Sequence, residues 1–319
     1  MALNKKTGAF TGMFVLFLSL SLIAGCGGFS KGKDTPPTSA AFAATGTEGI
    51  VMTFTPEQPP VKSYTQAPLN FMVEVRNKGT TTVPSAMFYL SGFDATLIPV
   101  TPNPIPLPQP LEGKTQFNPD GGYTLIQMGA QNINLPNEMP NYKPNFLLTA
   151  CYPYKTFATP MVCVDPNPTD TVSDKACQVQ KVIGTGSQGA PVAVESIETQ
   201  ATPRGMFFRI HIANVGSGTS GSGLAFDQMA LGACPGALTY NDLNKIKYMV
   251  TLGSNEPVAC QPINNEVRLV NNKATIFCQS PKSIQPLAYQ TPLKVELIYG
   301  YKNSVAKMVE VENLNFGRI

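Results

Sequence analysis

The sequence predicts an all-β protein made of two tandem immunoglobulin-like antiparallel β-sandwiches, which follow a signal peptide and a flexible tether. Three observations predict this fold. The 319 residues include 29 Pro and 27 Gly but only 13% charged residues, a composition that suits short strands joined by turns. Several segments alternate apolar and polar side chains, which is typical of strands with one buried face. The same strand pattern also occurs twice along the chain, between regular turn signals.

The N-terminus carries an export signal. Lys5 and Lys6 precede an uncharged apolar run over residues 13–23, and small residues then lead to Cys26. The run is shorter than the ~20 residues that a membrane-spanning helix needs. Ile23-Ala-Gly-Cys26 resembles the lipobox of prokaryotic lipoproteins, which implies that residues 1–25 are removed and that Cys26 is lipidated. The alternatives are an ordinary signal peptide or a membrane-spanning anchor with a chance Cys.

The rest of the chain divides by composition. Residues 26–45 are rich in Gly, Ser, Thr and Pro and predict a flexible tether. Residues 46–166 predict the first sandwich, residues 167–189 a linker with a short strand over Cys177–Ile183, and residues 190–319 the second sandwich. One segment breaks the β pattern: Tyr240–Met249 predicts a helix that Asn241 or Asp242 could cap.

Two pairs of matching segments indicate an internal duplication. Leu69–Gly79 and Met206–Gly216 share an apolar alternation that ends in Asn-x-Gly, at an offset of 137 residues. Tyr152-Pro-Tyr-Lys155 matches Tyr299-Gly-Tyr-Lys302 at an offset of 147 residues. Residues 161–164 match residues 308–311 at the same offset, so each unit is expected to close with a hairpin. The first hairpin would span residues 146–164, and the second would join residues 293–299 to residues 306–311.

The strand that ends in Asn-x-Gly before Thr- or Ser-rich turns resembles a segment of CARDB-like surface β-sandwiches. The resemblance covers about ten residues in each unit, at Asn77-Lys-Gly79 and Asn214-Val-Gly216. It implies an immunoglobulin-like fold and a surface role, and it transfers no binding residues. Together with the lipobox, it implies a prokaryotic surface lipoprotein, bacterial or archaeal.

Six of the seven cysteines are disulfide candidates once Cys26 is assigned to lipid: Cys151, Cys163, Cys177, Cys234, Cys260 and Cys278. Export places them in an oxidising compartment, and spacings of at least 12 residues argue against zinc. A turn at Phe157 would pair Cys151 with Cys163, and a second hairpin would pair Cys260 with Cys278. Cys177 and Cys234 would then remain, and a Cys163–Cys177 bridge is the alternative.

Few residues suggest chemistry. His211 is the only histidine and is expected to face solvent beside Phe207 and Arg209, which leaves no nucleophile–base motif. We therefore expect no enzyme activity, no catalytic residues, no cofactor and no bound metal. Asp165–Asp170 offers oxygen ligands for Ca²⁺, but its prolines favour a linker turn, and the question stays open at this point.

Two further motifs have a structural and a binding interpretation. The Pro-rich segment 99–110 predicts a stiff edge connection, with docking to an aromatic groove on a partner as the alternative. The repeated tyrosines, Tyr152 and Tyr154 with Tyr299 and Tyr301, are expected near hairpin tips. There they would either cover the core or stack on a sugar or a partner. Repetition in both units favours packing.

The sequence indicates a location more clearly than a partner. The formal charge is +3 and no Lys or Arg run occurs, so nucleic-acid binding is not expected. We expect a lipid-anchored protein on the outer face of the membrane or envelope with a structural, adhesion or protein-interaction role. Its partners would be the membrane, through the lipid, and other envelope or surface proteins. The alternative is a ligand-binding envelope lipoprotein that holds a glycan or presents a substrate. Exposed aromatics lining a concavity would favour that alternative, and an envelope hydrolase is a weaker third candidate.

Overall fold

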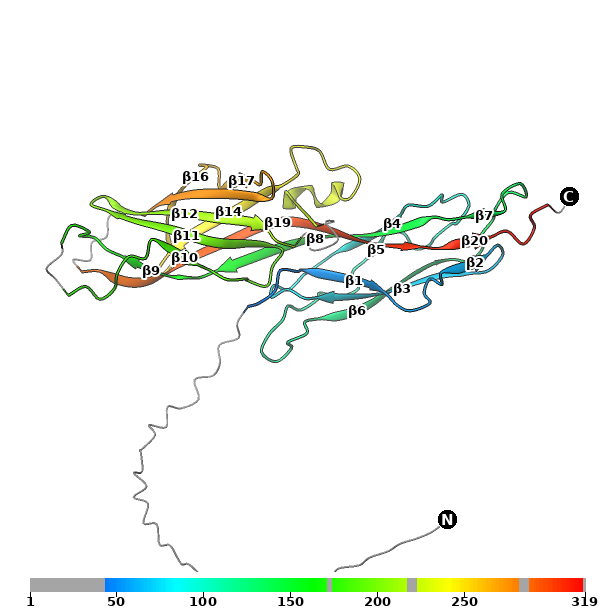
Figure 1. Cartoon of the computed structure of the whole chain (residues 1–319), viewed down its shortest axis with the longest axis horizontal. Helices are drawn as coiled ribbons and strands as arrows, with labels where there is room; N and C mark the ends of the chain where they lie inside the picture. Colours follow the sequence, from blue (N-terminus) through cyan, green and yellow to red (C-terminus); the bar gives the residue numbers. More distant parts are fainter. Residues whose placement is uncertain (1–43, 171–173, 217–222, 281–286, 318–319) are drawn as a thin grey trace, which may run out of the picture. The chain divides into compact units, whose positions relative to one another are not determined.

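A computed structural model describes residues 44–170, 174–216, 223–280 and 287–317. These residues belong to one compact unit, residues 42–319. Twenty strands and one short 3₁₀ helix, η1 (Gln228–Ala233), make up their regular structure, so the all-β prediction is confirmed. The strands form four sheets, most of whose pairings are antiparallel (Figure 1).

The sheets differ in size and strand order. One three-stranded sheet has the order β1 (Ile50–Phe54), β3 (Leu69–Asn77), β6 (Tyr123–Ala130). The five-stranded sheet has the order β10 (Val182–Gly184), β11 (Val192–Thr202), β12 (Gly205–Asn214), β18 (Lys273–Gln279), β16 (Ala259–Gln261). A second three-stranded sheet has the order β2 (Lys62–Tyr64), β20 (Glu310–Glu312), β7 (Asn141–Tyr142), in which β2 and β20 run parallel.

The largest sheet has nine strands. Its main path is β15 (Glu256–Pro257), β14 (Lys245–Leu252), β19 (Tyr289–Met308), β8 (Asn145–Ala158), β4 (Met87–Ser91), β5 (Ile105–Pro106). Off this path, β13 (Leu224–Phe226) and β9 (Met161–Val164) pair with β19, and β17 (Glu266–Arg268) pairs with β14. The Pro-rich segment supplies β5 at the end of this order, so its interpretation as an edge connection is confirmed.

The alternating strands bury the predicted faces. Phe71, Val73 and Val75 of β3 are buried, and so are their counterparts in β12, Phe208, Ile210 and Ile212. The Phe71 ring lies 4.7 Å from the ring of Phe146 on β8, measured between centroids. This contact joins the β1–β3–β6 sheet to the nine-stranded sheet, as in a sandwich with a dry core.

Strands β8 and β19 connect the two repeats. They pair over fourteen residues, from Val295 opposite Ala158 to Met308 opposite Asn145, and lie side by side in Figure 1. The expected closing hairpins are wrong, because Phe157 lies within β8 and residues 300–305 continue β19. Strand β9 pairs with β19 and not with β8. The boundaries at 46–166, 167–189 and 190–319 stay predictions, and both units contribute strands to one sheet.

The expected helix over Tyr240–Met249 is also wrong. Residues 245–252 form β14 and alternate buried and exposed side chains, with Ile246, Tyr248 and Val250 in the core. The capping signal belongs to a turn, since the Asp242 carboxylate accepts hydrogen bonds from the backbone N–H and the hydroxyl of Thr239. The predicted linker strand is shorter than expected, because only Val182–Gly184 pairs as β10.

Four buried tyrosines lie where the two repeats meet. Tyr152 stands opposite Tyr301, and Tyr154 opposite Tyr299, on either side of the Pro153–Gly300 pair. Neighbouring ring centroids are 5.9–6.2 Å apart. The interpretation as core packing is confirmed, but the tyrosines lie in the middle of long strands and not near hairpin tips.

Two of the four tyrosine hydroxyl groups make equivalent contacts in the two repeats. Tyr152 Oη accepts the backbone N–H of Ile50 at 3.1 Å, and Tyr299 Oη accepts that of Val192 at 3.2 Å. Tyr301 Oη donates to Asn214 Oδ1 at 3.1 Å, within the second Asn-x-Gly turn. Tyr154 Oη, the counterpart of Tyr301 Oη, donates instead to the carbonyl oxygen of Gly189 at 3.2 Å. The matching contacts of Tyr152 and Tyr299 support the internal duplication.

The glycines of the two Asn-x-Gly turns make room for these hydroxyl groups. A Cβ added to Gly216 would lie 2.7 Å from Tyr301 Oη, and one added to Gly79 would collide with Tyr154 Oη. Only glycine lets the backbone approach so closely. The glycine of the repeated Asn-x-Gly motif is therefore required by the packing of the tyrosines.

All six candidate cysteines form disulfides: Cys151–Cys234, Cys163–Cys177 and Cys260–Cys278. The Cys260–Cys278 prediction and the alternative Cys163–Cys177 pairing are confirmed. Pairing Cys151 with Cys163, and Cys177 with Cys234, was wrong because β8 does not turn at Phe157. Three disulfides indicate an oxidising environment outside the cytoplasm. Cys26, the predicted lipidation site, lies outside the described residues.

Candidate ligand-binding groove

The outer face of the five-stranded sheet presents a continuous ladder of side chains. Strand alternation turns Phe208 and Ile210 inward, so Phe207, Arg209 and His211 face outward, as the sequence predicts. The register places one row of residues side by side across five strands: Val182, Glu198, Arg209, Phe277 and Gln261. The next row consists of Gln200, Phe207, Gln279 and Ala259.

A groove of about 1010 Å³ runs over these two rows. Phe207 and Phe277 line it and keep 38% and 52% of their surface exposed, and Val182 adds apolar surface at one end. Phe277 stands opposite Arg209 and is thus a diagonal neighbour of Phe207 on the adjacent strand. Two large apolar rings on adjacent strands therefore line one concavity.

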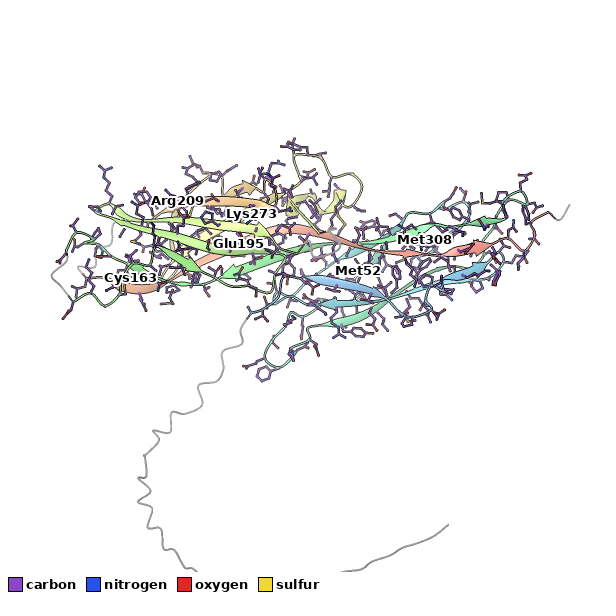
Figure 2. The ribbon with its side chains drawn as sticks, in the orientation of Figure 1. Met52, Cys163, Glu195, Arg209, Lys273 and Met308 are labelled. Carbon is purple, nitrogen blue, oxygen red and sulfur yellow. A yellow bond between two sulfur atoms is a disulfide. The ribbon has the colours of Figure 1, made fainter. Side chains whose placement is uncertain are left out.

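Two of the three charged side chains that line the groove, Glu198 and Arg209, pair with each other, and the third is Lys181. The Glu198 carboxylate is 3.1 Å from an Arg209 guanidinium nitrogen and 3.2 Å from His211 Nε2. His211 Nδ1 lies 3.1 Å from the Thr275 hydroxyl, so the imidazole is held from both sides. The hydrogen bond from Arg209, followed by that from His211, lowers the pKa of Glu198. The charges of Glu198 and Arg209 therefore largely cancel within the groove. Figure 2 labels Arg209 on this sheet, together with the ion pair of Glu195 and Lys273 (3.3 Å) further along it.

Three amide side chains complete the lining. Gln200, Gln261 and Gln279 are exposed at the groove. No described residue forms a hydrogen bond with any of these three amide groups. Each amide offers donors and an acceptor to a ligand. The groove therefore combines apolar rings with groups that can both donate and accept hydrogen bonds.

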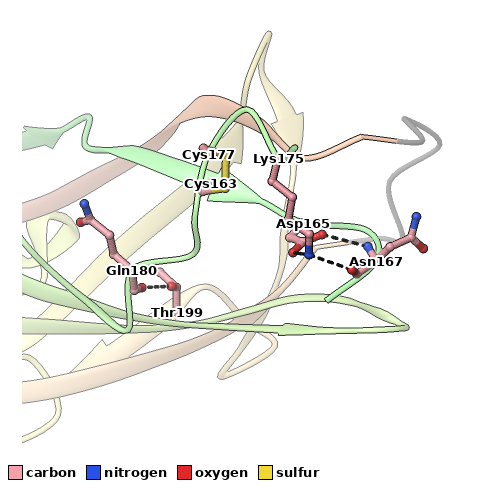
Figure 3. Close-up of a disulfide and its surroundings, with 7 residues drawn as sticks. All are labelled: Cys163, Asp165, Asn167, Lys175, Cys177, Gln180 and Thr199. Atoms are coloured by element: carbon pink, nitrogen blue, oxygen red, sulfur yellow. Dashed lines mark hydrogen bonds and ion pairs between the residues drawn. A yellow bond between two sulfur atoms is a disulfide. The ribbon is translucent and has the colours of Figure 1, made fainter. Parts of the chain in front are cut away.

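The possible Ca²⁺ loop has a different arrangement. The Asp165 carboxylate lies 2.6 Å from the Lys175 ammonium and accepts the backbone N–H of Asn167 (Figure 3). The Cys163–Cys177 disulfide holds both ends of this turn together. Because an ammonium group occupies the carboxylate, the loop is organised as an ion-paired turn. Within the described ranges, no three His, Cys, Asp or Glu side chains lie close enough to hold a metal ion.

Two smaller hollows have fewer exposed aromatic and amide side chains than the groove. One, of about 540 Å³, lies over the outer face of β14, β19 and β8, with Phe157 and Met249 as its exposed apolar side chains. Another, of about 430 Å³, lies beside β1 and β19 and reaches the buried Tyr152 and Tyr301. Neither brings two exposed aromatic rings together with free amide groups.

Sequence reasoning found half of this site. Alternation in β12 correctly turned Phe207, Arg209 and His211 outward. Phe277 and the three glutamines were missed, because the sequence does not show which strands flank β12. The alternation Ile276–Phe277–Cys278 in β18 carried a signal for an outward Phe277.

Comparisons with known proteins give little. No protein-family model and no curated protein matches the chain. Among solved structures, it is similar to the C-terminal globular domain of an oligosaccharyltransferase from Pyrococcus abyssi, with 8% identity and a TM-score of 0.22. It is also similar to the secreted serine protease VesC from Vibrio cholerae, with 10% identity and a TM-score of 0.19.

These matches cover 79% and 82% of this chain, and 45% and 50% of the two solved chains. The chain thus spans about half the length of the structures it matches. Likenesses this remote say nothing about its function. Among the described residues, no helix is long and apolar enough to span a membrane.

Proposed function

We propose that this chain is an exported, lipid-anchored surface protein that acts by non-covalent binding of an external partner in the groove on its five-stranded sheet. The export signal and the lipobox at Cys26 support the location, and the three disulfides agree with it. A binding protein of the adhesion or interaction class is the function that this groove suits best.

One observation carries the proposal: two half-exposed phenylalanines, Phe207 and Phe277, lie together in a concavity. Exposed apolar surface that gathers in a hollow with a polar rim is typical of binding sites. Covering such a ring is favourable by roughly 25 cal/mol per Å² of apolar surface removed from water. A partner that covers both rings would gain this energy.

The electrostatics favour binding over catalysis. Glu198, the carboxylate of the groove, is held by Arg209 and His211, and its pKa is lowered. A general acid would need a raised pKa near the working pH. Glu198 therefore suits a role in fixing the shape and charge of the groove.

Anchoring is tested by replacing Cys26. Wild-type protein should partition with detergent, whereas Cys26→Ser should stay uncleaved or be released, because lipid attachment needs the thiol. Stable attachment requires two chains or a second signal. Recovery of all wild-type protein in the aqueous phase would contradict the anchor without affecting the groove.

Binding is tested with isolated envelope material of the producing cell. Wild-type protein should be retained on it, and Phe207→Ala and Phe277→Ala should each weaken retention about two- to tenfold, as expected for loss of one aromatic contact. Phe117→Ala is the matched control, since Phe117 is 89% exposed and lies outside the groove. Equal retention of all four proteins would overturn the proposal.

A further inference from the structure

We propose that the ligand of the groove is an uncharged, hydroxyl-rich glycan chain. This inference rests on the proposed binding function and goes further by naming the ligand class. It follows from three properties of the groove: the paired backbone of its three central strands, its exposed amide and aromatic side chains, and the ion pair between Glu198 and Arg209.

The backbone groups of the central strands beneath the groove already form hydrogen bonds with neighbouring strands. Strand β12 pairs with β11 on one side and with β18 on the other, and β11 and β18 pair in turn with β10 and β16. Extended peptides are commonly recognised through main-chain hydrogen bonds at a free sheet edge. The three central strands are paired on both sides, so over them a ligand contacts side chains alone, whereas Val182 of β10 and Gln261 of β16 belong to the two outer strands of the sheet.

The side chains that remain match hydroxyl groups. Gln200, Gln261 and Gln279 surround the two rings in the register of the sheet. An amide can both donate and accept hydrogen bonds, and so can a sugar hydroxyl. A polymer with many hydroxyl groups could therefore satisfy all three amides at once.

The phenylalanine rings suit the apolar face of a sugar. A pyranose ring has an apolar C–H face, which packs against an aromatic ring. Phe207 and Phe277 lie on adjacent strands as diagonal neighbours, a spacing of roughly 7–8 Å between backbone positions. Two neighbouring sugar units of one chain could each cover a ring.

The charges favour a neutral ligand. Glu198 and Arg209 neutralise each other, and His211 and Thr275 complete their network. Glu198 already holds the Arg209 guanidinium, so among the described residues of the lining Lys181 is the cation left for an anionic polymer. Binding of a polyanion usually rests on several cationic groups, which this lining does not gather.

The test uses the mature lipoprotein in a detergent without a sugar headgroup. Binding is measured to immobilised neutral polysaccharides (dextran, mannan, galactan and a β-glucan) and to the anionic polymers alginate and hyaluronate. We expect at least one neutral polymer to bind, with an affinity that changes little between low and high salt. Phe207→Ala and Phe277→Ala should each weaken that binding about two- to tenfold.

Two controls keep the result interpretable. Phe117→Ala should bind as wild type does, and near-UV circular dichroism checks that each variant is folded. Gln279→Ala, at an exposed strand position, should weaken binding without removing a ring.

The inference would be overturned if no neutral polymer binds, or if only the anionic polymers bind and salt abolishes their binding. Envelope material that still binds through the groove, but loses binding after protease and not after periodate, would retain the proposed function and overturn the glycan assignment.

Discussion

The two repeats of the chain share an interior and differ on the outside. At the 137-residue offset, Phe71, Val73 and Val75 of β3 correspond to Phe208, Ile210 and Ile212 of β12, and all six are buried. The outward positions between them carry different side chains: Asn70, Met72 and Glu74 in β3, but Phe207, Arg209 and His211 in β12. The residues that pack the fold are thus alike in the two repeats, and those that face outward differ.

The shared interior extends to the tyrosines and the Asn-x-Gly turns. Tyr152 and Tyr299 accept equivalent backbone N–H groups, and Gly79 and Gly216 make room for equivalent hydroxyls. A site that appears on one repeat alone is therefore not required by the fold. The comparison predicts symmetric effects on stability from core changes and asymmetric effects on binding from surface changes.

The largest expected effect is alkaline unfolding. Burial raises the pKa of Tyr152, Tyr154, Tyr299 and Tyr301, so these groups stay neutral in the fold and ionise near pH 10 once unfolded. Stability is complete below that pH and falls above it, by up to about 1.4 kcal/mol per tyrosine per pH unit. Ultraviolet titration should show these four of the 11 tyrosines ionising only as the protein unfolds. Reversible ionisation of all 11 in folded protein would contradict the buried cluster.

Loss of a disulfide comes next. The Cys151–Cys234 bridge joins β8 of the first repeat to the end of η1 in the second, across 83 residues. By chain entropy, removing it with Cys151→Ala and Cys234→Ala should lower the free energy of unfolding by about 4–5 kcal/mol. The matched change at Cys163 and Cys177, which are 14 residues apart, should cost about 3 kcal/mol. Denaturant titration measures both, and peptide mapping that finds free thiols in the native exported protein would refute the pairing.

The pairing of distant strands could not be predicted from the sequence. Local alternation predicted the strands over residues 50–54, 69–77 and 206–214, because a two-residue period reports which side of a strand is buried. The alternation could not predict that β8 and β19 continue as strands through the tyrosines, because Pro153 and Gly300 are residue types typical of turns. Their pairing is a contact between segments about 150 residues apart, and the Cys151–Cys234 bridge depends on it.

A smaller, symmetric effect is expected from the tyrosine hydroxyls. Tyr152→Phe leaves the Ile50 N–H without its acceptor, and Tyr299→Phe does the same to Val192 and also removes the hydrogen bond between Tyr299 and Thr156. Each change should lower the free energy of unfolding by about 1–3 kcal/mol, the cost of an unsatisfied buried donor. Tyr240→Phe, at a 77% exposed side chain, is the control and should have little effect. A loss confined to one repeat would break the proposed equivalence.

The smallest expected effect concerns acid. Because the pKa of Glu198 is lowered from its ordinary value of 4.5, its ion pairs stabilise the folded state above that pH and are lost as the pH falls through the lower folded value. Carboxyl titration by NMR should give Glu198 a midpoint below 4.5, and Arg209→Ala should raise it. Because the carboxylate is solvent-exposed, the effect on global stability should be slight. An unchanged midpoint in Arg209→Ala would contradict the charge pairing of the groove.

The groove was less predictable from the sequence than the core. The outward direction of Phe207 and Arg209 follows from alternation within one strand. Their partners Glu198, Phe277 and Gln261 lie on three other strands, and only the register brings them together. A groove lined by residues of five strands has no local sequence signature.

The most direct test compares matched double variants in the two repeats. Phe207→Ala with Phe277→Ala removes both rings, and Asn70→Ala with Gln127→Ala changes the corresponding positions of β3 and β6. Affinity for the bound neutral polysaccharide should fall about 4- to 100-fold in the first and stay unchanged in the second, while both unfold at the wild-type denaturant concentration. Equal affinities in the two double variants would contradict the claim that the second repeat alone carries the binding site.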